Sequence, residues 1–142
     1  MPHPTSLLHD AYFVTHFRCP ELPESWPDEF AVITAYATTG ESWTAEENEE
    51  ADRHLKEALE ATALSPIRIT GYSPDTGHSE PGWAVALPLE AACDLGVQFK
   101  QDAIYWISGN QLSVTLCDDR RVLVPVDTFR NRVSVESSKI QE

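Results

Sequence analysis

The loop SPDTGHSEPG at residues 73–82 holds the side chains best suited to chemistry, because Asp75, His78 and Glu80 lie within six positions. Carboxylates and imidazoles bind divalent metal ions, and a loop can bend so that such ligands converge. The same groups can act as a general acid and base, since a carboxylate can orient an imidazole. The spacing matches no established zinc motif such as HExxH. A metal-dependent or acid/base hydrolase is therefore one hypothesis.

Two other interpretations fit the same loop. Asp75 can close a Ser-Pro-Asp turn, with His78 and Glu80 bonded to neighbouring backbone groups. Alternatively the loop contacts a ligand or partner, because loops on a rigid scaffold often carry binding residues. The sequence implies no cofactor other than a divalent metal ion held by these three side chains.

Three polar residues elsewhere are candidate ligand-binding residues. Tyr72 precedes the loop, Asn48 lies in the first turns of a predicted helix, and Gln101 precedes an apolar strand. A buried amide in such a place usually satisfies backbone groups of a loop. The chain contains no GxSxG elbow, P-loop or GxGxxG motif. These observations favour a non-enzymatic binding domain over an enzyme.

The charge of the chain restricts its partners. The 142 residues include 10 Lys and Arg against 23 Asp and Glu, a formal net charge of -13, and the acid is densest between residues 41 and 60. Such a field repels nucleic acid and attracts basic partners. We expect no generic nucleic-acid binding. A basic protein partner would contact the acidic helix at Glu46, Glu49, Glu50 and Glu57. A solvated helix face and mimicry of nucleic-acid phosphate are the alternatives.

The sequence also predicts a cytoplasmic protein that does not associate with membranes. Its longest apolar runs reach five residues, whereas roughly 20 are needed to cross a bilayer. No secretory signal is visible at the start of the chain. The three cysteines lie far apart and form no CxxC pair, which fits a reducing compartment.

The hydrophobic pattern predicts the elements that must position these residues. Thr44 and Glu47 form a capping box at the start of a helix over residues 45–62, whose apolar residues fall on one face and whose carboxylates occupy the rest. A shorter helix is expected over residues 89–99. Strands are predicted over residues 11–17, 30–36, 67–72, 83–87, 103–107, 111–116 and 122–126.

This order of elements indicates an α+β fold. We expect a mostly antiparallel sheet of about five to seven strands with two helices packed on one face. Residues 1–10 are expected to be a loose N-terminal lead-in, residues 11–131 a single domain, and residues 132–142 a weakly ordered tail.

Four phrases carry a resemblance to a known family. They are ITAY at residues 33–36, ENEEADRHL at 47–55, GYSPDTGHSEPGWAV at 71–85 and LGVQFKQDAIYWI at 95–107. Together they resemble the bacterial family catalogued as domain of unknown function three-two-nine-three. The resemblance implies a small, mostly bacterial, stand-alone protein with no assigned activity. Its polar pattern matches this chain at Asn48, Asp75, His78, Glu80 and Gln101.

The chain departs from that family pattern at two places. Ala37-Thr38 stands where the family often has Asn-Pro, and Lys100 stands where it often has a glycine before the glutamine. A family site that included either position would be altered in this protein.

Overall fold

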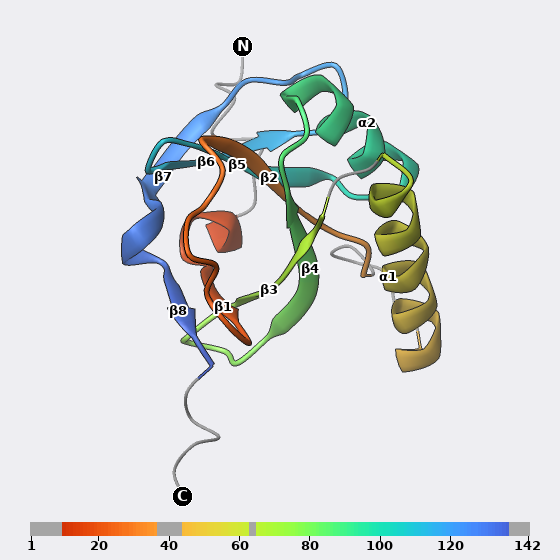
Figure 1. The fold of residues 1–142 in the computed structure, drawn as a ribbon, viewed down its shortest axis with the longest axis horizontal. Helices are drawn as coiled ribbons and strands as arrows, with labels where there is room; N and C mark the ends of the chain where they lie inside the picture. Colours follow the sequence, from red (N-terminus) through yellow and green to blue (C-terminus); the bar gives the residue numbers. More distant parts are fainter. Residues whose placement is uncertain (1–9, 37–43, 63–64, 137–142) are drawn as a thin grey trace, which may run out of the picture.

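The computed structural model describes residues 10–36, 44–62 and 65–136, which form two α-helices and an eight-stranded sheet (Figure 1). The helices are α1 (Ala45–Glu60) and α2 (Leu89–Gln98). Short 3-10 helices are η2 (Asp10–Phe13) and η3 (Phe129–Asn131). The strands are β1 (His16–Cys19), β2 (Glu29–Thr34), β3 (Ile67–Tyr72), β4 (Ser79–Val85), β5 (Ala103–Ser108), β6 (Gln111–Leu116), β7 (Val124–Thr128) and β8 (Val133–Val135).

The strands follow the order β7-β6-β5-β2-β4-β3-β1-β8, and each neighbouring pair is antiparallel except the parallel pair of β1 and β8. The predicted α+β class and mostly antiparallel sheet are confirmed, but the predicted count of five to seven strands is too low. The extra strand is β8, which lies in the segment expected to be a tail. Its three residues pair only with β1, more than a hundred positions earlier, so no local pattern indicates it.

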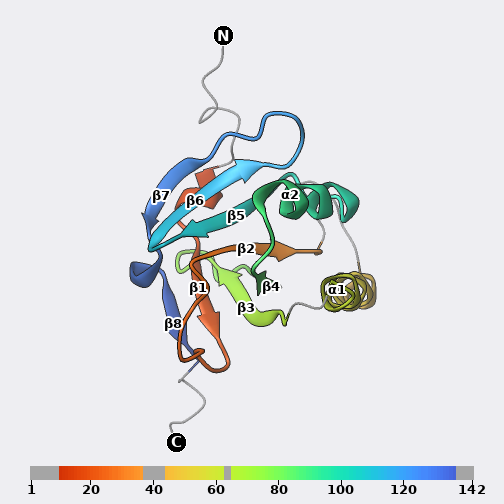
Figure 2. The same ribbon diagram turned by 45° about the horizontal axis from the view of Figure 1, so that its top comes forward.

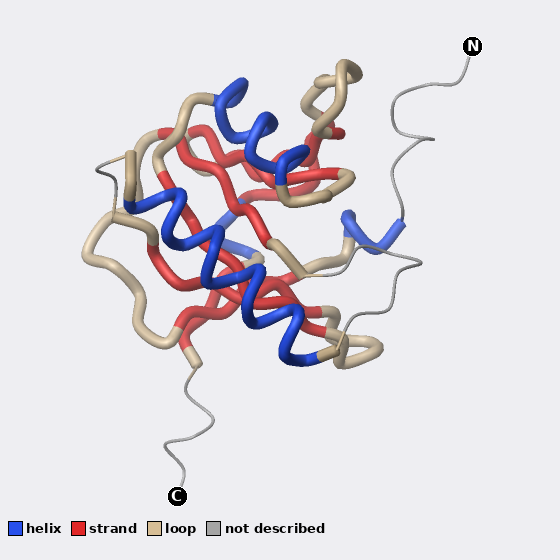
Figure 3. Tube along the Cα trace, turned by 90° about the vertical axis from the view of Figure 1, so that its right-hand side faces the viewer, coloured by secondary structure: helices blue, strands red, loops and turns tan. Residues whose placement is uncertain are grey.

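Both helices pack on the outer face of the sheet (Figure 3). Leu55 and Leu59 from α1 and Ala92 from α2 are fully buried in one hydrophobic cluster with the outward-facing residues of β2 and β4. The predicted capping box is confirmed, because Glu47 N donates to Thr44 Oγ1 at 3.0 Å and Thr44 N donates to Glu47 Oε1 at 2.8 Å. Within the described residues, neither helix is long and apolar enough to cross a membrane.

The sheet is strongly curled, so its inner face encloses a second hydrophobic cluster (Figure 2). The ring of Phe17 on β1 meets that of Tyr105 on β5 edge to face, with centroids 5.1 Å apart. Phe30 on β2 stacks on Trp26 at 5.1 Å. Because β2 is covered on both faces, four of its six residues are buried, as its continuous apolar sequence indicates.

The segment before β1 differs from the prediction. Residues 11–17 are expected to be a strand, but Asp10–Phe13 is a 3-10 helix and β1 starts at His16. Thr15 Oγ1 donates to the carbonyl of Ala11 at 2.8 Å, a local bond that competes with strand pairing. Residues 1–9, most of the expected lead-in, lie outside the described residues, as do Ala37-Thr38 and residues 137–142.

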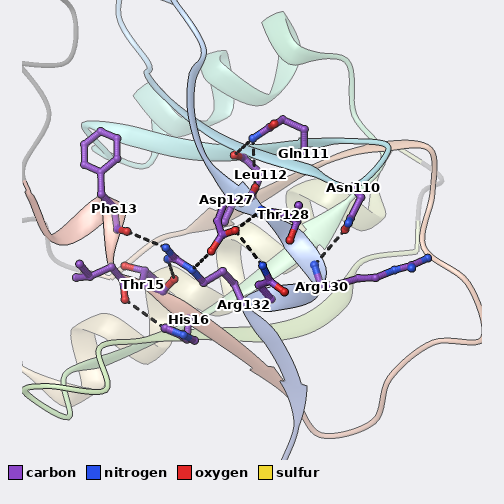
Figure 4. Close-up of polar contacts among 12 residues, drawn as sticks. Phe13, Thr15, His16, Asn110, Gln111, Leu112, Asp127, Thr128, Arg130 and Arg132 are labelled. Atoms are coloured by element: carbon purple, nitrogen blue, oxygen red, sulfur yellow. Dashed lines mark hydrogen bonds and ion pairs between the residues drawn. The ribbon is translucent and has the colours of Figure 1, made fainter.

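An arginine holds this N-terminal segment against the two edge strands (Figure 4). Arg132 Nε donates to Asp127 Oδ2 at 2.9 Å, linking the segment before β8 to β7. Its Nη1 and Nη2 donate to the carbonyls of Thr15 at 2.9 Å and Phe13 at 3.1 Å. The Arg132 side chain is only 14% exposed. These bonds fix the position of Tyr12 beside the inner face of the sheet.

Candidate functional site

A pocket of about 160 Å³ opens on the inner face of the curled sheet, beside η2. Its polar wall comes from Thr34 on β2, Glu80 on β4, Gln101 before β5 and the loop residue His78. Its other walls include Phe17, Val32, Ile104 and tyrosines 12, 72 and 105. The pocket therefore brings together segments from most of the described chain.

Strand register explains why the polar side chains meet. Thr34 pairs with Gly82, and Glu80 pairs with Gly71, along three adjacent strands. A Cβ at Gly82 would lie 2.6 Å from the carbonyl oxygen of Ile33 and 2.7 Å from Thr34 Cγ2, so only glycine permits this close approach. Gly71, which pairs with Glu80, also lines the pocket, and a Cβ there would lie 3.3 Å from Thr15 Cγ2 and 3.7 Å from Phe17 Cε1.

Hydrogen bonds connect the polar wall into a chain. Gln101 Nε2 donates to the carbonyls of Tyr36 at 2.7 Å and Phe99 at 3.2 Å, which fixes the orientation of the amide. Gln101 Oε1 therefore faces the pocket side and lies 3.0 Å from Thr34 Oγ1. The same hydroxyl lies 3.3 Å from Glu80 Oε1. The Gln101 amide thus bonds to backbone carbonyls of the adjoining loops, as the sequence predicts.

The end of α2 places Gln101 at this wall. Lys100 N donates to Val97 O at 3.0 Å and Gln101 N donates to Gly96 O at 2.8 Å, the two bonds of a Schellman cap. Lys100 has a φ of 62°, and no other non-glycine residue in the described ranges has a positive φ. Glycine adopts this conformation without steric cost. A glycine at position 100, as in the family pattern described above, would adopt this backbone conformation without strain.

Of the three loop residues predicted to act together, the structure brings together two. His78 Nε2 lies 3.0 Å from Glu80 Oε2, with the His78 side chain 70% exposed and that of Glu80 29% exposed. Asp75 lies in the exposed turn and does not line the pocket. Gly77 N donates to Ser73 O at 2.8 Å and closes that turn. Across the described ranges, no three His, Cys, Asp or Glu side chains are grouped to hold a metal ion.

The other candidates are divided between the two faces of the sheet. Tyr72 and Gln101 line the pocket, whereas Asn48 is half-buried on α1 and does not. The four predicted partner-binding carboxylates of α1 are exposed: Glu46, Glu49, Glu50 and Glu57. Glu50 lies 3.7 Å from Arg53.

Burial keeps the pocket tyrosines neutral. Burial, followed by the charges of Asp102 and Glu80, raises the pKa of Tyr12 to about 12. Burial also raises the pKa of Tyr105, whose hydroxyl donates to Tyr12 O at 2.8 Å. Among the described residues that line the pocket, Glu80 and His78 are the ones with acidic or basic side chains apart from the tyrosines.

A second polar cluster, which the sequence does not single out, lies on the outer face. The carboxylates of α1 were expected outside its apolar face, but Asp52 is 9% exposed and accepts bonds from Arg68 Nη1 at 3.2 Å, Arg68 Nη2 at 2.7 Å and Trp83 Nε1 at 3.1 Å. The signal was present, since Asp52 falls three residues before Leu55 and seven before Leu59, on the buried face of α1. Thr34 was also missed, although it is the polar residue that ends an apolar strand.

Comparison with known proteins adds the family but no activity. A family model described as "Protein of unknown function (DUF3293)" matches residues 33–104, just over half of the chain. The chain belongs to this family. The matched span contains Thr34, His78, Glu80 and Gln101, so the whole polar wall of the pocket lies within it. No curated protein and no solved structure matched the chain.

Proposed function

We propose that this DUF3293 protein is a cytoplasmic, non-enzymatic binding domain whose pocket holds one small organic molecule. The observation that supports this is the pocket of about 160 Å³, in which a few hydrogen-bonded polar groups converge on an otherwise apolar and aromatic lining. Ligand sites in proteins have this composition, with the polar groups fixing orientation. A cavity of about 150 Å³ engineered in another protein accommodates benzene, which indicates the size of ligand expected.

A ligand screen with a pocket-filling variant tests this function. Gly71→Val directs a branched side chain into the pocket opposite Glu80, and Ala86→Val makes a similar enlargement at an exposed position outside the pocket. Molecules that raise the Tm of the wild type should do so for Ala86→Val and not for Gly71→Val. Circular dichroism checks that both variants fold. If no molecule shifts the Tm, or if Gly71→Val responds like the wild type, the pocket is not a binding site.

The pair of His78 and Glu80 supports a second candidate, acid/base hydrolysis. A carboxylate bonded to an imidazole, here at 3.0 Å, is an arrangement used by general bases. Turnover of a panel of small esters, lost in His78→Ala and retained in the matched loop variant Asp75→Ala, would establish the hydrolase. Ligand binding without turnover would support the non-enzymatic function.

The exposed face of α1 supports a further binding role, contact with a basic protein partner. Its carboxylates stay in solvent while Asp52 on the same helix turns inward. We expect Lys substitution of Glu46, Glu49 and Glu50 to abolish binding to a basic partner. Lys substitution of Glu21, Glu24 and Asp28, also exposed, changes the net charge equally away from α1 and should leave binding intact. Equal loss in both triple variants would indicate a general charge effect only.

A further inference from the structure

The number of protons available in the polar wall leaves one carboxylate oxygen with only a shared donor. The Thr34 hydroxyl has one proton and two neighbouring acceptors, Gln101 Oε1 at 3.0 Å and Glu80 Oε1 at 3.3 Å. Because two backbone carbonyls hold the Gln101 amide with Nε2 away from Thr34, Gln101 Oε1 can only accept. Glu80 Oε1 therefore shares the single Thr34 proton with Gln101 Oε1, and no other described side chain donates to it.

The second oxygen of Glu80 is only weakly engaged. Glu80 Oε2 accepts from His78, whose side chain is 70% exposed and is therefore hydrated. An ionised carboxylate has about four acceptor sites. Glu80 thus retains acceptor capacity on the side that faces the pocket, and a bound molecule that supplied N–H or O–H donors would satisfy it.

The electrostatic field of the pocket distinguishes a cation from a neutral donor. No lysine or arginine within the described ranges lines the pocket, and Glu80 contributes to raising the pKa of both Tyr12 and Tyr105. Asp102 acts in the same direction on Tyr12. Aromatic rings, here those of Tyr12 and Tyr105, attract cations to their faces. An anion would meet repulsion from Glu80, and Arg132, whose charge also acts on Tyr105, is already paired with Asp127.

We propose that the pocket binds a small organic ammonium ion, a primary or secondary amine on an apolar body about the size of a benzene ring. The ammonium group donates to Glu80 Oε1, and the apolar body packs against Phe17, Val32 and Ile104. This assignment rests on the proposed binding function and names the class of ligand. Glu80 selects the charge, while Gln101 and the backbone carbonyls that hold it orient the Thr34 hydroxyl beside Glu80.

Three probes of the same shape and different charge test the assignment: benzylamine, benzyl alcohol and benzoate, titrated into the full chain near neutral pH and followed by calorimetry or NMR. Both benzylamine and benzyl alcohol can donate to Glu80, but only the ammonium carries a charge opposite to the carboxylate, and ionised donors strengthen such bonds. Benzylamine should therefore bind about tenfold more tightly than benzyl alcohol, and benzoate should bind weakest. Glu80→Gln should remove the preference for benzylamine. Asp75→Asn, which removes an exposed carboxylate from the same loop, should keep it.

The possible results distinguish a failure of the ammonium assignment from a failure of the proposed binding function. If benzyl alcohol or benzoate binds as well as benzylamine, or if Glu80→Gln retains the preference, the ammonium assignment is overturned and the pocket function stands. The same holds if none of the three binds while other molecules bind in a manner that Gly71→Val abolishes. If nothing binds, both proposals fail. Urea denaturation of Glu80→Gln confirms that a lost preference is not a lost fold.

Discussion

Asp52 on α1 and Glu80 on β4 lie on opposite faces of the sheet at strands β3 and β4, and the surroundings of the two carboxylates differ. On the outer face Asp52 is 9% exposed and accepts two bonds from Arg68 and one from Trp83. On the inner face Glu80 has an exposed histidine on one oxygen, and its other oxygen shares the single proton of the Thr34 hydroxyl with Gln101. Burial and complete pairing identify Asp52 as a structural group, whereas Glu80 lies beside a pocket with acceptor capacity unused.

The contrast shows why the count of partners matters more than the presence of a charge. The guanidinium of Arg68 also lies 3.8 Å from the ring centroid of Trp83 and donates to Gly82 O at 3.2 Å, so the outer cluster is closed on itself. Adding a ligand there would displace existing bonds. At Glu80 a ligand would form bonds that the protein leaves unmade, and net binding energy comes from that difference.

The largest expected effect comes from neutralising the two carboxylates in turn. Asp52→Asn turns an amide donor toward Arg68 and leaves the guanidinium without its partner, and breaking such a pair costs about 3 kcal/mol. Glu80→Gln should change the free energy of unfolding by less than about 1 kcal/mol, because its bonds are long or exposed. Urea denaturation monitored by circular dichroism measures both. A cost at Glu80 equal to that at Asp52 would remove the contrast.

A smaller effect is expected at Trp83. Trp83→Phe removes the N–H donated to Asp52 and part of a buried ring, at a cost of about 2 kcal/mol. The double variant with Trp83→Phe and Asp52→Asn should lose about 1 kcal/mol less stability than the sum of the two single losses, since both changes remove the same hydrogen bond. In the double variant with Trp83→Phe and Glu80→Gln the two losses should add, because the side chains of Trp83 and Glu80 belong to opposite faces of the sheet. Coupling between Trp83 and Glu80 would show that the two faces are not independent.

Lys100→Gly should stabilise the protein slightly. Relief of the positive φ of Lys100 contributes about 1 kcal/mol, and the greater chain entropy of glycine in the unfolded state offsets part of it, leaving about 0.5 kcal/mol. Lys100→Ala keeps the strained backbone and should give no gain, which separates the backbone effect from the loss of charge. Ligand affinity should be unchanged in both. A gain in the alanine variant would attribute the effect to charge.

The sequence predicts best what local chemistry determines. The capping box of Thr44 and Glu47 is confirmed because both bonds form within four residues. The α+β class follows from hydrophobic periodicity. His78 and Glu80 were expected to converge with Asp75 in one loop, but β4 begins at Ser79 and only His78 and Glu80 meet. Family resemblance, carried by four short phrases, is also confirmed.

What the sequence could not predict depends on distant contacts. The role of Thr34 requires Gln101, 67 positions later, and β8 is a strand only because β1 pairs with it. The spacing of Asp52 from Leu55 and Leu59 places it on the buried face of α1, but nothing local identifies its partners Arg68 on β3 and Trp83 on β4. In each case the missing information is which distant segments lie next to each other in the sheet and on its two faces.

The smallest expected effect is on the pKa of Tyr12, which should respond to the charge of Glu80 and not to that of Asp52. The raised pKa of Tyr12, about 12, owes most to burial, then to Asp102 and Glu80. Glu80→Gln should therefore lower the pKa of Tyr12 by a fraction of a unit and leave it above the unfolded value near 10, whereas Asp52→Asn should not change it. Absorbance at 295 nm against pH, taken as the difference from Tyr12→Phe in each background, measures this pKa.

The raised pKa of Tyr12 also makes the free energy of unfolding depend on pH. Because the folded state retains this proton between about pH 10 and 12 and the unfolded state does not, the contribution of Tyr12 to stability is present below pH 10 and falls as pH rises. An equal shift in Asp52→Asn would mean that the outer carboxylate reaches the pocket electrostatically, and would make Glu80 one of two charges acting on its ligand.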